Sequence, residues 1–399
     1  CGVGLLKRLG NPTGEDGFLS SSHIAAQPLL TRLSEIEMTI AQSAVQGYLS
    51  TLTNHLGVIE ETELRRLTGR VPARHQHPVF GRYDGHLLFE ERLTEFVDPS
   101  VLPQAQEALK VFFKTAFGDR HLKPVPYYAV LLADGDHMGK AIDAQTTQHA
   151  DPIEAHRQLS AQLSCFAAGV KEIVEQDYQG SLIYAGGDDV LALVPLHMAI
   201  ACARALAKSF GDFLSPFKFT QTDSAKASPT LSVGLAIVHH IDPLSDALAL
   251  ARDAEKEAKR IPGKNALCVM VSKRSGAITT VADGWGAIDQ RLHYFTLLHL
   301  AEAIPDGAAY ELRNLATQLA QIPDAVPREA IRILQRKRAE KGQAALSEQV
   351  LQKLAAMIEP GNLALLANEL IVARLLAEAQ EQAGMTAEQA RQQLKESAE

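Results

Sequence analysis

The chain has 399 residues, enough for about two or three domains, and its 46% hydrophobic and 22% charged content is ordinary for a globular protein. Its net charge of -8 gives no sign of a broad nucleic-acid-binding face, although metal ions could still mediate contacts to phosphates. The four cysteines form no CxxC pair, which argues against a zinc finger within the chain and against a secreted disulfide framework.

The N-terminus has no basic region followed by an apolar core, so no signal peptide is indicated. The longest uncharged apolar run, Val190–Ala203, contains Pro195 and is too short to span a bilayer. We therefore expect a cytoplasmic protein without a membrane partner. Because the sequence begins with Cys1 rather than Met, we also expect a fragment of a longer protein.

The first zone of the chain, residues 1–126, is predicted to be a helical and linker domain. Amphipathic patterns predict helices near Gln27–His55 and Gln104–Phe117. The stretch between them, near Val71–Asp84, is rich in Pro, His, Gly and Arg and is typical of a loop.

The middle zone, residues 127–275, changes to alternating strand and helix patterns. An apolar run ends abruptly at Asp134, as a buried strand would, and two β-rich runs flank the sequence GGDD, which indicates a hairpin. The predicted elements are a strand at Tyr127–Ala133, a helix at Ile153–Gln176, hairpin strands at Ser181–Ala185 and Val190–Val194, a helix at His197–Leu214, a strand at Thr230–His239, a helix at Pro243–Arg260 and a strand at Ala266–Ser272. This order predicts the α+β class and a ferredoxin-like palm, with one antiparallel sheet and helices on one face.

The third zone, residues 284–399, has helical periodicity interrupted by short turns that contain Pro and Gly. It predicts a C-terminal domain of about five or six helices. The palm is therefore expected between two helical domains.

Four carboxylates are expected to meet at one end of the palm sheet. Asp134 and Asp136 follow the first strand, and Asp188 and Asp189 form the tip of the hairpin that lies beside it in an antiparallel palm. Crowded carboxylates raise each other's pKa unless cations fill the gap between them. Mg²⁺ or Mn²⁺ suits such a site, because these ions prefer oxygen ligands and leave positions open for substrate phosphates. Two such ions could activate a ribose 3′-hydroxyl and stabilise a pyrophosphate leaving group.

The GGDD sequence has an ordinary interpretation as well. Gly186 and Gly187 would permit positive φ and let a triphosphate approach the backbone closely. GGDD alone is equally typical of a solvated tight turn, with Asp134 capping a loop. The strand that ends in Asp-Gly-Asp and the long segment before the hairpin favour the metal site.

Basic residues near the palm are candidates for phosphate binding. Lys259 and Lys264 lie at and just after the end of a predicted helix, where they could neutralise β- and γ-phosphates. Glu255 and Lys259 also fit an i,i+4 surface pair, so a structural role stays open. Lys140 and His137 follow the first pair of acids and are equally ambiguous.

These motifs give the middle zone a resemblance to the GGDEF and class III nucleotide cyclase superfamily. The matching pieces are DGDHMGK at 134–140, GGDD at 186–189, SVGLA at 232–236 and ARDAEKEAKRIPGKN at 251–265. The form GGDD, rather than GGDEF, resembles the large subunit of type III CRISPR effector complexes. The opening CGVGLLKR and the later SSSHIAA are similar to the stretch after the zinc-finger cysteines in the type III-B large subunit.

The resemblance implies an enzyme that converts ATP to cyclic oligoadenylates when its complex binds target RNA. It implies Asp134, Asp188 and Asp189 as catalytic residues and ligands of Mg²⁺ or Mn²⁺, with Asp136 as a fourth ligand. It also implies phosphate contacts through residues of the turn and of the last palm helix, namely Gly186, Gly187, Lys259 and Lys264. The implied partners are the other effector subunits, the guide RNA and the target RNA.

The chain also departs from this family. It contains no His-Asp dipeptide for an HD nuclease, no first palm domain and no paired zinc-finger cysteines, of which Cys1 alone could remain. Because two palms together form the ATP cleft in the family, we expect this chain alone to be incomplete for cyclisation. Two alternatives stay open: a non-catalytic scaffold subunit of the same complex, and a stand-alone GGDEF-like cyclase.

Overall fold

The computed structural model describes residues 17–55, 71–95, 97–148, 150–220, 225–274, 276–305, 307–318, 325–340, 348–358 and 362–396. Cys1 and the CGVGLLKR segment lie outside the described residues, so the expectation of a truncated zinc finger is not addressed by the structure.

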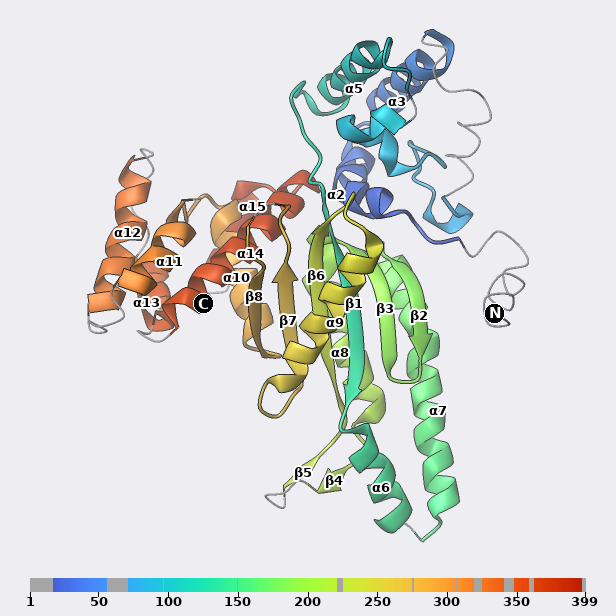
Figure 1. Ribbon diagram of the computed structural model, residues 1–399, viewed down its shortest axis with the longest axis vertical. Helices are drawn as coiled ribbons and strands as arrows, with labels where there is room; N and C mark the ends of the chain where they lie inside the picture. Colours follow the sequence, from blue (N-terminus) through green and yellow to red (C-terminus); the bar gives the residue numbers. More distant parts are fainter. Residues whose placement is uncertain are drawn as a thin grey trace.

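A six-stranded sheet forms the centre of the molecule, with the strand order β2-β3-β1-β6-β7-β8 (Figure 1). Its strands are β1 (Tyr127–Asp136), β2 (Ser181–Gly186), β3 (Asp189–Pro195), β6 (Thr230–His239), β7 (Ala266–Val271) and β8 (Thr279–Gly284). The predicted hairpin is confirmed as β2 and β3, and β1 pairs antiparallel with both β3 and β6. The strand β8 lies beyond residue 275, the predicted end of the palm, yet it belongs to the same sheet.

The expectation of a wholly antiparallel sheet is wrong at one pair. Strands β6 and β7 run parallel and are joined by the crossover helix α9 (Leu244–Arg260). A parallel pair needs such a crossover, since its two strands start from the same edge of the sheet. Helix α6 (Met138–Gln148) and the short ribbon of β4 (Phe219–Thr220) and β5 (Lys226–Ala227) were not predicted.

Helices cover both faces of the sheet, so the prediction of helices on one face is also wrong. One face packs against α9 and the N-terminal helices; the other packs against α7 (Pro152–Lys171) and α8 (Ala199–Leu214). Strand β6 shows the reason. Its Leu235 belongs to one core and its neighbour Ala236 to the other, because the apolar run continues through both side-chain positions.

The N-terminal layer consists of α2 (Ser21–Glu35), α3 (Met38–Ser50) and α5 (Leu102–Phe117), linked by short 3₁₀ turns that include η3 (Gly85–Leu88) and η4 (Glu90–Glu95). The amphipathic stretch predicted near Gln27–His55 is two helices, separated at Ile36. Helix α2 begins earlier than predicted because Ser20 caps it, its side chain accepting a hydrogen bond from the His23 amide.

The described part of the C-terminal zone is helical throughout. Its helices are α10 (Ile288–Leu300), α11 (Ala308–Gln318), α12 (Val326–Glu340), α13 (Glu348–Met357), α14 (Leu363–Gln382) and α15 (Ala387–Glu396). Helix α14 also packs on the sheet, where Val372 and Leu376 join the core beneath α8. Within the described ranges, no helix combines the length and the apolar content that a membrane crossing requires.

Candidate active site

The end of β1 and the tip of the β2–β3 hairpin lie against each other. The pairing between β1 and β3 ends at Ala133 and Val190, so the hairpin turn extends alongside the next residues of β1. A Cβ atom on Gly135 would lie only 2.8 Å from the Cβ and Oδ2 of Asp188. The glycine between Asp134 and Asp136 therefore provides the space in which Asp188 sits.

The structure brings three of the predicted acids into one electrostatic cluster. Burial raises the pKa of Asp188, and repulsion from Asp189 and Asp134 raises it further. Burial and the charge of Asp134 likewise raise the pKa of Asp189. Part of this rise comes from repulsion between neighbouring carboxylates, and a cation placed among the three side chains would oppose it.

Lys259 is the lysine that faces these acids. Its Nζ forms an ion pair with both oxygens of Asp134 and lies 3.2 Å from Glu255 Oε1. Burial alone would lower the pKa of Lys259, but Asp134 and Glu255 raise it above its ordinary value. The predicted i,i+4 pair with Glu255 is therefore present, Lys259 also contacts Asp134, and phosphate binding by Lys259 remains a prediction.

Gly234, in the SVGLA motif, explains how Lys259 reaches β1. A Cβ at this position would lie 2.7 Å from the backbone carbon of Ala254 and 2.8 Å from Glu255 Cα. Because these are backbone atoms of α9, a side chain here would push the helix away from β6. The glycine thus sets the close packing that places Glu255 and Lys259 over the end of β1.

Asp136 lies in a different environment from the other acids. It is fully buried, and its Oδ2 accepts hydrogen bonds from Thr230 Oγ1 (2.9 Å), Ser232 Oγ (2.8 Å) and the Asn265 amide (3.0 Å). These bonds tie β1 to β6 and to the turn after α9. Its Oδ1 has no hydrogen-bond partner among the described residues. Metal ligation by Asp136 remains a prediction, while its hydrogen bonds indicate a structural role.

The turn held by Asp136 carries Lys264. Gly263, Lys264 and Asn265 all have positive φ, of 84°, 58° and 48°. Two consecutive non-glycine residues in this region store backbone strain, which the Asp136 bond helps to offset. Lys264 lies close enough to His137 to lower the pKa of that imidazole, after burial as the larger cause. Phosphate binding by Lys264 also remains a prediction.

Trp285 supports the same turn from β8. Its indole Nε1 donates to the Leu231 carbonyl oxygen (3.0 Å), and its amide donates to the Asn265 carbonyl oxygen (2.9 Å).

The two glycines of GGDD have different roles. Gly187 has φ of 65° in the turn, as expected, whereas Gly186 lies in β2, pairs with Asp189 and is not among the glycines with positive φ. The expectation of positive φ is therefore wrong for Gly186. The ring of Tyr184 lies where a Cβ of Gly186 would be, and this tyrosine is 54% exposed. Sequence reasoning missed Tyr184, although an aromatic residue two positions before the turn was a usable signal.

The residue types suit a divalent ion, but Asp134, Asp188 and Asp189 do not form a group with all ligand atoms within 4.8 Å of one another, so metal ligation by them remains a prediction. Asp134, Asp188 and Asp189 offer carboxylate oxygens, as Mg²⁺ and Mn²⁺ prefer, and Lys259 compensates only part of their charge.

A known protein family matches the part of the chain that forms most of the sheet. Residues 127–268 match the model of the family described as Cas10/Cmr2, second palm domain. Over these residues the chain is similar to that second palm domain. A curated relative, the CRISPR system Cmr subunit Cmr2 of Pyrococcus furiosus, is 35% identical over 186 residues, which cover 41% of this chain and 21% of the relative.

One solved structure has a similar fold beyond the second palm domain. The cryo-EM structure of a Type III-B Cmr-beta bound to cognate target RNA aligns with 91% of this chain and 48% of that chain, at a TM-score of 0.51 and 12% identity. A crystal structure of a Csm1-Csm4 cassette in complex with cA4 aligns with 63% of this chain and 36% of that chain, at a TM-score of 0.40 and 14% identity. The chain thus spans less than half of each of these proteins.

Proposed function

We propose that this second palm domain is the nucleotidyltransferase of a type III CRISPR effector, converting ATP to cyclic oligoadenylates when the complex binds target RNA. The observation that carries the proposal is the convergence of Asp134, Asp188 and Asp189 on one end of the sheet, with their charge only partly compensated. The family match of residues 127–268 supports it.

The three carboxylates would hold Mg²⁺ or Mn²⁺. These ions would activate the ribose 3′-hydroxyl and stabilise the pyrophosphate leaving group. In the structure Lys259 pairs with Asp134. Once a metal ion neutralises Asp134 instead, the Lys259 ammonium would be available to bind triphosphate oxygens next to Gly187. Asp136 would act at a distance, by holding the turn that carries Lys264.

We propose that the partners are other subunits of the effector, the guide RNA and the target RNA. The relative is named as a Cmr complex subunit, and the Cmr-beta structure contains target RNA. Because this chain carries a net charge of -8, RNA would be held by local basic patches or by the other subunits.

The non-catalytic scaffold is the second candidate. The Lys259–Asp134 ion pair favours it, since an ammonium bound to a ligand carboxylate already neutralises part of the site.

The test uses the assembled complex with ATP, Mg²⁺ and target RNA. The pair Asp188→Ala and Asp189→Ala should lower the yield of cyclic oligoadenylates by about 100-fold or more. The pair Asp212→Ala and Asp253→Ala removes the same charge from exposed, ion-paired positions and should leave the yield unchanged.

Three outcomes would contradict the proposal. Equal yields from both pairs of variants would place the chemistry elsewhere. A complex that binds target RNA but neither binds ATP with metal nor forms product would establish the scaffold. Cyclic di-GMP made from GTP without RNA would establish a stand-alone cyclase.

A further inference from the structure

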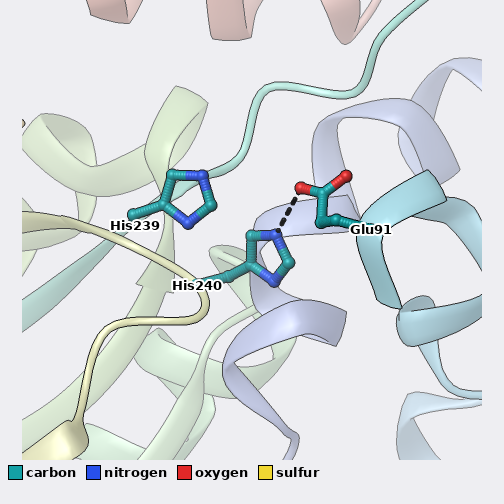
Figure 2. A group of neighbouring side chains, drawn as sticks. All are labelled: Glu91, His239 and His240. Carbon is teal, nitrogen blue, oxygen red and sulfur yellow. Dashed lines mark hydrogen bonds and ion pairs between the residues drawn. The ribbon is translucent and has the colours of Figure 1, made fainter. Parts of the chain in front are cut away.

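A second cluster of ligand-type side chains lies at the opposite end of the central strands. His239 and His240 are at the end of β6, and Glu91 comes from η4 in the N-terminal layer (Figure 2). One ligand atom from each of the three residues lies within 4.8 Å of the others. Strand β6 pairs with Asp136 at its first residue and has 10 residues, so the cluster is roughly 30 Å from the acidic site.

The imidazole of His240 is fixed from two sides. Its Nδ1 lies 2.9 Å from Ser22 Oγ and its Nε2 lies 3.3 Å from Glu91 Oε1, the interaction drawn in Figure 2. Its ring stacks on Phe89, with the ring centroids 4.0 Å apart. A histidine that binds a metal usually has its second nitrogen hydrogen-bonded in this way, which sets the tautomer and the ring direction.

His239 is held less tightly. Its ring packs edge-on against Tyr127, with the centroids 5.5 Å apart, and its Nδ1 accepts a long 3.4 Å hydrogen bond from the Ile241 amide. Such a long bond is weak and costs little to lose. Ligand atoms around a tetrahedral ion with bonds of about 2.1 Å lie roughly 3.4 Å apart. The Glu91–His240 pair already has this spacing, and the half-exposed Glu91 can move toward His239.

The charges around the cluster suit a cation. Burial lowers the pKa of both histidines, so their imidazoles are neutral at pH 7 with a lone pair to donate. The hydrogen bond with His240 lowers the pKa of Glu91, so this carboxylate is ionised. When a metal binds Nε2 of His240, the ring proton lies on Nδ1, where Ser22 Oγ can accept it. Asp242 adds a second negative charge beside His239. The opposing cations are Arg274 and Arg92, of which Arg92 is paired with Glu95 at 2.6 Å.

We propose that Glu91, His239 and His240 bind a transition-metal ion at the junction of the N-terminal layer and the palm sheet, with Zn²⁺ as the first candidate. Two imidazoles and one carboxylate are a ligand set of Zn²⁺ and its first-row neighbours, whereas Mg²⁺ prefers oxygen ligands alone. Three protein ligands leave a fourth position for water or for a group of a partner. The ion would join η4 to the end of β6 and so fasten the two layers together.

The test is a titration of the full chain with Co²⁺, which replaces Zn²⁺ and reports its ligands by visible absorption. The chain carries Asp188→Ala and Asp189→Ala throughout, so that binding at the acidic site does not contribute. One Co²⁺ per chain should give a tetrahedral spectrum without a thiolate charge-transfer band, and Zn²⁺ should abolish it. Glu91→Gln should weaken this binding by about 10-fold or more.

The matched control is Glu90→Gln. Glu90 is the neighbouring glutamate of similar exposure, and it forms an ion pair with Lys110 at 3.9 Å. The Glu90→Gln chain should bind Co²⁺ with the affinity of the parent chain. Zn²⁺ should raise the thermal unfolding midpoint of the parent and of Glu90→Gln, but not that of Glu91→Gln. Equal affinity in all chains, no stoichiometric band, or a thiolate band would overturn the proposal and leave a hydrogen-bonded cluster only. If Glu91→Gln folds poorly, His239→Gln supplies the same comparison.

Discussion

Two groups of carboxylates in this molecule face different cations, a lysine in the palm and an arginine beside the C-terminal helices. At the acidic end of the sheet, Asp134 is paired with Lys259, while Asp188 and Asp189 retain raised pKa values. Where the sheet meets the C-terminal helices, Arg291 of α10 donates to both oxygens of Glu369 at 3.0–3.1 Å and to Asp283 Oδ2 at 3.0 Å.

The difference separates a structural ion pair from a site that is prepared for a ligand. Glu369 is 1% exposed, and burial raises its pKa, but the planar guanidinium of Arg291 opposes that rise by donating hydrogen bonds to it from within the chain. The acids of the palm are more exposed and share one flexible ammonium, so their remaining charge is available to a ligand from solution. The two regions therefore differ in the exposure of their carboxylates and in the cation that faces them, not in the presence of carboxylates.

The largest expected effect on stability comes from removing the cation that pairs with the buried Glu369, and removing Lys259 gives the comparison. Arg291→Met should lower the free energy of unfolding by about 3–5 kcal/mol, because Glu369 would remain buried without a partner. Lys259→Met should cost about 1 kcal/mol or less, since that ion pair is partly exposed. Urea denaturation of both variants measures the difference. Equal losses would remove the distinction between the two regions.

An intermediate effect is expected where α9 contacts β6. Gly234→Ala should cost about 1–3 kcal/mol, because the added methyl group meets the backbone of α9. Gly211→Ala in α8, where nothing lies within 4 Å of the added Cβ, should instead gain about 0.5–1 kcal/mol. The same denaturation series tests this. A neutral Gly234→Ala would show that the site does not depend on this close approach.

The smallest effect is expected at the acids themselves. Asp188→Asn should raise the free energy of unfolding at pH 7 without metal by up to about 0.5 kcal/mol, because the folded state no longer holds a repelled charge. The pKa of Asp188 is raised in the folded state. As the pH falls from this pKa to the ordinary aspartate value, the folded wild type binds the proton before the unfolded chain does, so its free energy of unfolding rises toward that of the variant. Thermal melts at pH 7 and pH 3 compare the two proteins. A less stable variant at pH 7 would mean that the carboxylates are compensated after all.

Local signals in the sequence were sufficient for the hairpin and for the meeting of its tip with β1. A two-residue turn between apolar runs fixes the hairpin, and an antiparallel neighbour fixes which ends meet. The burial of both faces of the sheet was also indicated in the sequence, because β6 is apolar at side-chain positions on both faces. The prediction of helices on one face instead assumed a strand that alternates between buried and exposed residues.

Partners across long sequence separations could not be predicted. Lys259 lies 125 positions from Asp134, and Asn265 lies 129 positions from Asp136, so each pairing depends on the packing of α9. For the same reason the sequence did not show that Asp136 is buried while Asp134, two positions earlier, is partly exposed. Glu91 and His240 are 149 positions apart and lie in different layers.

Trp285 is the single tryptophan of the chain, and it contacts the turn that Asp136 holds. The indole emission therefore reports on this one corner of the palm, free of signals from other tryptophans. Occupancy of the neighbouring acids can thus be followed in the unlabelled protein by fluorescence, through any ligand that shifts the Asn265 backbone.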